Sequence, residues 1–174
     1  YLLTASTRWD GSSVLSTGNK WTAFPSLALG WKINKESFLE NVKSISDLKL
    51  RASIGYTGND NVAPYQSLAL LDQQTFYANG NELVPGLQSS VFANQSLTWE
   101  KTRELNFGLD FGFLRNRITG SVDVYDRLSE NLIYRQQLPA EMGIKYTYGN
   151  VGSVSNKGVE VMLNTKNIKS NLIT

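Results

Sequence analysis

The sequence predicts an all-β chain, built as an antiparallel meander of about six strands. Three observations support this fold class. Apolar and polar residues alternate with a period of two in one segment after another, these segments are long, and their connections are short at one end and long at the other. Because successive side chains of a strand point to opposite faces, each segment gains one apolar and one polar face.

Each strand is expected from its own alternation. In the third segment, apolar side chains occupy every second position from Leu48 to Tyr56, and polar or small ones lie between them. The fourth segment places Leu105 and Phe113 at the ends of an apolar row and Asp110 on the opposite face. The alternating segments span residues 1–9, 21–33, 48–57, 104–114, 118–125 and 159–164.

Segment length and aromatic placement favour a membrane barrel over a soluble sheet. A tilted strand needs about 9–11 residues to cross a bilayer, and residues 21–33, 48–57 and 104–114 are that long. Strands of soluble sandwiches average about 5–6 residues. Aromatic residues lie on the apolar faces near strand ends, as in the interfacial girdles of transmembrane barrels. These residues are Trp9, Trp21, Trp31, Tyr56, Phe111 and Phe113.

The connections show the same asymmetry as outer-membrane barrels, which have short turns on one side and long loops on the other. Residues 115–116 form a tight turn, whereas 10–20, 59–98 and 135–156 are long loops rich in Gly, Asn and Ser. The connection at 34–47 departs from this pattern, because it lies on the short-turn side but is not short. Its residues 36–42 are expected to form a helical turn. Gly11 and Gly58 are expected to supply positive φ where strands end. Both chain ends look cut. Residue 1 lies inside an expected strand, and the sequence stops at residue 174, just after an expected turn at 167–171.

Composition argues against an enzyme. Histidine is absent, which removes the commonest general base and metal ligand, and cysteine is absent too. Glu100 and Glu104 lie about 13 Å apart if both are on one strand, too far for the carboxylate pair of a glycosidase. A net charge of +2 is too small to imply binding to nucleic acid. We therefore predict no catalytic, cofactor or metal residues.

Four groups of motifs, in order along nearly the whole chain, resemble the SusC/RagA-like branch of the TonB-dependent transporters. The first is an Arg-Trp-Asp-Gly-Ser-Ser run followed by Asn-Lys-Trp, Phe-Pro-Ser and Gly-Trp, and the second is a Leu-Lys-Leu-Arg strand ending in Thr-Gly-Asn. A Leu-Thr-Trp-Glu-Lys-Thr run and a late Asn-Val-Gly and Asn-Lys-Gly-Val-Glu pair follow. They occupy residues 8–13, 19–31, 48–59, 97–110, 150–152 and 156–160.

This resemblance implies a large transmembrane outer-membrane β-barrel of about 22 strands around a plugged lumen. Residues 1–174 would form about a quarter of the wall, with the plug domain and the remaining strands lying outside them. The family imports glycan oligosaccharides or oligopeptides with energy from TonB, beneath a SusD-like surface lipoprotein. The implied partners are therefore the rest of the barrel, its plug, TonB, that lipoprotein and outer-membrane lipid, at the bacterial outer membrane. Charged residues on the polar faces would point into the lumen: Arg51, Glu104, Asp110, Asp123 and Glu160.

Two alternatives remain open from the sequence. One is a different outer-membrane barrel, such as a siderophore receptor or a porin. The other is a soluble β-sandwich that binds carbohydrate through aromatic loop residues, which would stack on sugar rings. The sequence assigns no substrate-binding residues, although loop aromatics are candidates for contact: Tyr65, Phe76, Tyr77, Tyr146 and Tyr148.

Overall fold

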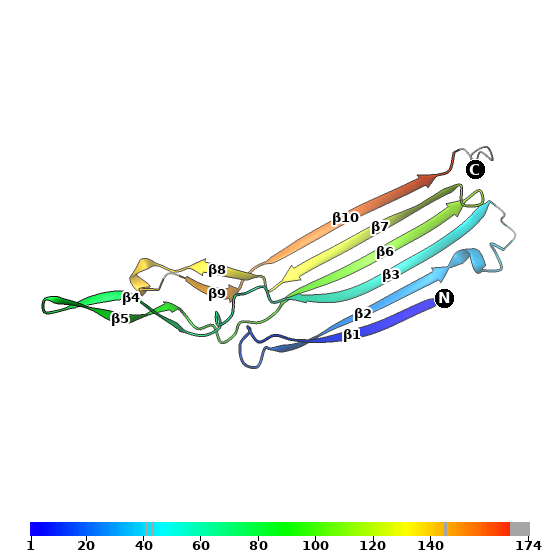
Figure 1. Ribbon diagram of the computed structural model, residues 1–174. Coiled ribbons are helices and arrows are strands. Elements are labelled where there is room, and N and C mark those ends of the chain that lie inside the picture. The colour runs from blue at the N-terminus through cyan, green and yellow to red at the C-terminus, as the bar shows by residue number, and fades with distance from the viewer. Residues whose placement is uncertain (41, 43, 145, 168–174) are drawn as a thin grey trace, which may run out of the picture.

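The computed structural model describes residues 1–40, 42, 44–144 and 146–167. Within these residues, ten strands form two sheets, a long curved six-stranded sheet and a smaller four-stranded sheet beyond one of its ends (Figure 1). The fold class is confirmed as all-β and antiparallel. The predicted turn at 167–171 lies largely outside the described residues.

The six-stranded sheet is the meander that the alternation predicts. Its strand order is β1-β2-β3-β6-β7-β10, and every neighbouring pair is antiparallel. The last strand starts at residue 153, six residues before the predicted segment, because the positions of its first half that share a face with Val159 are Ser153, Ser155 and Lys157. The strands are β1 (Leu2–Gly11), β2 (Trp21–Lys32), β3 (Ile45–Asn59), β6 (Glu100–Phe113), β7 (Ile118–Glu130) and β10 (Ser153–Thr165).

Two connections lie at the short-turn end of this sheet, one tight and one longer. Between β6 and β7 the chain turns through Leu114, Arg115 and Asn116, all with positive φ, and the Arg117 amide donates to the Phe113 carbonyl at 3.0 Å. The helical turn expected at 36–42 appears as hydrogen-bonded turns among the residues described there, since the Leu39 amide donates to the Glu36 carbonyl at 2.9 Å and the Val42 amide donates to the Leu39 carbonyl at 3.0 Å. A short 3-10 helix, η1 (Ile33–Lys35), precedes it, and residue 41 lies outside the described residues.

The long loops contain a second sheet that the sequence analysis missed. Its order is β4-β5-β9-β8, formed by β4 (Leu70–Asn79), β5 (Glu82–Val91), β8 (Ile133–Gln137) and β9 (Tyr146–Asn150). A second 3-10 helix, η2 (Ala140–Met142), lies between β8 and β9. The signal for the hairpin was present, because Asn79-Gly80 is a strong tight-turn sequence and Gly80 has φ 64°.

The six-stranded sheet is a single layer with two unlike faces. Within the described residues no second layer covers its apolar side, where Phe107, Val161 and Leu163 are each at least 60% exposed. A soluble sandwich would bury such a face against a second sheet, so this alternative does not describe the fold. No helix among the described residues is long and apolar enough to cross a membrane.

Two glycines serve a different purpose from the one predicted. Gly11 and Gly58 lie inside strands, and neither is among the positive-φ residues. A Cβ added at Gly11 would lie 2.8 Å from the Trp21 indole, and one at Gly58 would overlap the Phe24 ring. These positions therefore provide space for an aromatic ring of the neighbouring strand.

Candidate functional site

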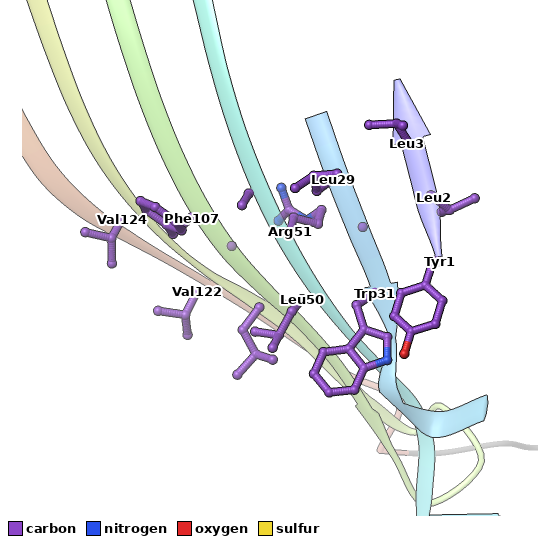
Figure 2. A pocket seen from close by; sticks show the side chains of 14 residues that line it. Tyr1, Leu2, Leu3, Leu29, Trp31, Leu50, Arg51, Phe107, Val122 and Val124 are labelled. Carbon is purple, nitrogen blue, oxygen red and sulfur yellow. The ribbon is translucent and has the colours of Figure 1, made fainter. Parts of the chain in front are cut away.

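The apolar face of the six-stranded sheet is the first candidate surface. Figure 2 shows Trp31 of β2, Leu50 of β3 and Val122 of β7 projecting from the sheet, with Tyr1 beside Trp31. The rings of Tyr1 and Trp31 stack with centroids 6.1 Å apart. This face carries a hollow of about 710 Å³ lined mainly by apolar side chains. Soluble monomers rarely expose apolar patches of more than a few hundred Å², so this face suits hydrocarbon better than water.

The outer edge of the apolar face runs obliquely across the strands. On β7 and β10 it ends at the Val124–Val159 pair, because the next pair on that face is Asp126–Lys157, an ion pair of 3.0 Å. The row of paired residues that contains Val124 and Val159 can be followed across the sheet to Leu3 of β1. On β1 the apolar face continues for three more rows, to Trp9.

This shift gives the angle of the strands to the edge. Three rows span about 20 Å along a strand and five strand spacings span about 24 Å across the sheet, so the strands tilt by about 40° from the normal to that edge. Strands of transmembrane barrels tilt by about 35–45°. The pattern of side chains and the pairing register together therefore match a membrane-crossing wall.

The polar face is held by an ion cluster that joins three strands. Arg51 of β3 donates to Asp110 of β6 through Nε at 2.9 Å and Nη2 at 2.8 Å, and Nη2 also donates to Asp123 of β7 at 2.9 Å. Nearer the outer end, Arg127 donates to Glu104 at 2.7 Å. These predicted polar-face residues therefore lie together on one side of the sheet. Glu160 lies on the same face, opposite Asp123 in the register.

Gly108 makes the reach from Arg51 to Asp123 possible. It lies in β6, between the two charged residues in the cross-strand row. A Cβ at this position would lie 2.6 Å from Arg51 Nη2 and 2.5 Å from Asp123 Oδ1. The guanidinium therefore crosses β6 directly above the glycine backbone.

A small core forms where the long loops meet the outer end of the sheet. Leu15 of the first loop, Phe24 of β2, and Leu97 and Trp99 before β6 pack into one cluster, and each is at most 5% exposed. The Phe24 and Trp99 rings meet edge to face at 5.7 Å. Burial of this cluster fixes the loops to the wall because exposure of four large apolar side chains would be costly.

Side-chain amides and one carboxylate complete this junction. Asn150 accepts from the Thr98 amide at 2.9 Å and donates to the Thr98 carbonyl at 2.8 Å, as a strand neighbour would. Glu100 accepts from the Ile133 amide at 2.7 Å and from Asn59 Nδ2 at 2.6 Å. Two loops distant in sequence, 60–99 and 131–152, thus join at one place, and Glu100 has a structural partner on each oxygen.

The five candidate loop aromatics do not form one site. Tyr146 packs edge to face against Tyr148 at 5.9 Å, and Tyr148 packs on the loop core. Tyr65 lines a separate pocket, and Phe76 and Tyr77 are exposed on β4. Sequence reasoning gave no role to Asn19 or Asn150 and considered Glu100 only beside Glu104, although all three lie in the recognised motifs. Among the described residues, no group of His, Cys, Asp and Glu could hold a metal ion.

Comparison with known proteins agrees with this geometry. The family described as "TonB dependent receptor-like, beta-barrel" matches residues 1–171. The chain belongs to this family. The predicted resemblance to its SusC/RagA-like branch is confirmed by the relatives and structures below.

The chain is 42% identical over 173 residues to TonB-dependent receptor SusC of Bacteroides thetaiotaomicron, covering 97% of this chain and 17% of that protein. It is 38% identical over 174 residues to TonB-dependent receptor P39 of Formosa agariphila, covering 100% of this chain and 16% of the relative. The chain thus spans about a sixth of the length of these relatives.

Solved structures give the same result. In the RagAB peptide importer in the "closed-closed" state, one chain superposes with a TM-score of 0.84 at 31% identity, over 97% of this chain and 18% of that one. A second structure, of the RagAB peptide transporter, gives a TM-score of 0.83 at 31% identity, over 97% of this chain and 18% of that one.

Proposed function

We propose that this chain is part of the wall of a TonB-energised outer-membrane importer of glycan oligosaccharides or oligopeptides. The observation that carries the proposal is the oblique apolar face, whose edge corresponds to a strand tilt of about 40°. Family membership and the similarity to SusC and the RagAB importer support it. We assign the chain no catalytic role.

Each part of the structure has a place in this proposal. The apolar face contacts outer-membrane lipid, and the polar face with the Arg51 cluster lines the lumen and meets the plug. The four-stranded sheet lies outside the cell, where it would meet a SusD-like lipoprotein, while TonB acts from the periplasm. Six strands represent about a quarter of a 22-strand barrel, and the remaining strands complete the wall.

A gene deletion tests this function. A strain lacking the full gene is incubated with fluorescent oligosaccharides and with fluorescent oligopeptides, and uptake into the periplasm is measured. We expect uptake of one class to be lost in the deletion strain and restored by the intact gene. Dissipation of the proton gradient should stop uptake in the complemented strain. Unchanged uptake of both classes in the deletion strain would contradict the proposal.

A further inference from the structure

A second pocket lies beside the loop core, at the outer end of the sheet. It has a volume of about 460 Å³, and it is formed by the first loop and by residues that flank the β4–β5 hairpin. Small-molecule sites usually have volumes of about 300–1,000 Å³. Its lining combines hydroxyl, amide, ammonium and aromatic groups with a small apolar base: Ser13, Leu15, Lys20, Tyr65, Ser67 and Gln95.

The back wall of this pocket is fixed before any ligand arrives. Leu15 is 1% exposed and belongs to the loop core. Ser16 donates to the Leu97 carbonyl through its amide at 3.3 Å and its hydroxyl at 2.8 Å, and it accepts from Asn19 Nδ2 at 3.0 Å. A preformed wall binds ligand with less loss of conformational entropy than a mobile loop does.

The polar groups that face this pocket remain available for a ligand. Among the described residues, the side chains of Ser13, Lys20, Ser67 and Gln95 make no hydrogen bond or ion pair. A neighbouring polar pocket differs, because Asn94 and Asn150, which line it, already bond to backbone groups. The pocket beside the loop core therefore offers free donors and acceptors to a ligand. The neighbouring pocket uses its donors and acceptors to bond its own loops together.

The chemistry of the lining favours a sugar. Hydroxyl and amide groups both donate and accept, which suits a ligand that carries many hydroxyls. None of the lining residues is a carboxylate, so the pocket has no group to pair with a peptide amine or a basic side chain. Tyr65 is 67% exposed and has φ 68°, a backbone conformation that is uncommon for an aromatic residue and that concentrates at ligand sites.

We propose that this pocket binds one sugar unit of an oligosaccharide, with Tyr65 stacked on the ring and Lys20 and Gln95 bonded to its oxygens. The proposal rests on the importer function above and selects glycans over peptides as its cargo. Lys20 also gives the pocket a preference for sugars that carry an acidic group. The pocket would hold a chain at the outer mouth of the barrel.

Binding to the purified full-length transporter tests the proposal. The probes are fluorescent maltohexaose, laminarihexaose, xylohexaose and hexagalacturonic acid, with a pool of fluorescent hexapeptides as the comparison class. We expect at least one hexasaccharide to bind. Tyr65→Ala and Gln95→Ala should each raise its Kd by about tenfold, whereas Tyr65→Phe should keep most of the affinity.

Tyr134→Ala is the matched control, because Tyr134 is an exposed aromatic of the outer sheet that does not line the pocket. It should bind like the unaltered protein. Sugar binding that Tyr65→Ala and Gln95→Ala leave unchanged would refute the pocket while leaving the importer function intact. Binding of hexapeptides alone, or of no probe, would refute the sugar assignment. The deletion strain described above tests transport separately, so the two failures can be distinguished.

Discussion

The six-stranded sheet and the four-stranded sheet are both β structure, but they are held together in different ways. In the wall, β3 and β6 pair from Ile45 to Asn59 with one irregularity near the rim. In the outer sheet, β4 and β5 shift register twice, and β5 meets β9 at the single pair Val91–Tyr146. Backbone pairing is therefore continuous across the wall, whereas the outer sheet consists of two antiparallel strand pairs, β4–β5 and β8–β9, that meet at one position.

The largest expected effect comes from adding volume inside the wall. Gly120→Ala would place a Cβ against the Met162 carbonyl of β10 and 2.6 Å from the Phe111 ring. Because backbone must move to accommodate this Cβ, we expect the free energy of unfolding of the barrel to fall by about 2–4 kcal/mol. Less assembled transporter should result. The measurement is the temperature at which the folded barrel loses its resistance to SDS. Gly55→Ala is the control, because its Cβ would meet only Ser26 at 3.6 Å; equal losses would contradict this prediction.

The next effect tests the ion cluster that joins three strands. Arg51→Met leaves Asp110 and Asp123 without their donor, and we expect the free energy of unfolding to fall by about 2 kcal/mol. The same SDS-resistance temperature is the measurement. Arg8→Met is the control, because the Arg8–Asp10 pair is exposed and lies within one strand, so its loss should stay within about 0.5 kcal/mol.

Gly108→Ala should reproduce most of the Arg51→Met effect by displacing the guanidinium. The double variant should then cost less than the sum of the two single variants, because both disrupt the same contact. Additive losses would show that Gly108 acts independently of Arg51.

A smaller and local effect is expected at the base of the outer sheet. Asn150→Ala removes both bonds to Thr98 and the 2.8 Å bond to the Asn131 carbonyl. We expect faster protease cleavage within residues 60–97, from a local loss of about 1–2 kcal/mol, while the SDS-resistance temperature stays unchanged. Asn61→Ala, at an exposed position, should leave cleavage unchanged. A lower SDS-resistance temperature for Asn150→Ala would show that wall and loops are one cooperative unit.

The smallest effect on the wall should follow removal of the hairpin itself. Replacement of residues 70–91 by a short Gly-Ser turn removes β4 and β5 but keeps the loop core and the Asn150 bonds. We expect the barrel to assemble in normal amounts with the same SDS-resistance temperature, because those strands pair with β9 at one position only. Failure to assemble would contradict the division into wall and outer sheet.

The wall could be predicted from the sequence because one face of every strand carries a periodic signal. Leu48–Tyr56 and Leu105–Phe113 alternate without a break, so position alone assigns their faces. The outer strands lack this regularity, since β4 reads Leu-Leu-Asp-Gln-Gln-Thr and its register shifts. Its turn, Asn79-Gly80, is a clear local signal, but the surrounding composition is typical of a loop.

The loop junction was beyond prediction for a different reason. Asn150 and Thr98 lie 52 residues apart, and no local pattern pairs an amide side chain with a particular backbone unit. The same holds for Glu100 and Ile133. The motifs include Thr98, Glu100 and Asn150 but not Ile133, and the roles of all four depend on contacts that only the folded chain brings together.

The paired bonds between Asn150 and Thr98 have a consequence for how such proteins diversify. These bonds close the base of the 60–97 loop whatever residues the loop contains. The loop can therefore change in length or sequence while the strands of the six-stranded sheet keep their register. Members of the family could therefore exchange this loop as a unit and recognise new ligands with an unchanged wall. Its boundaries for grafting would be Asn59 and Thr98.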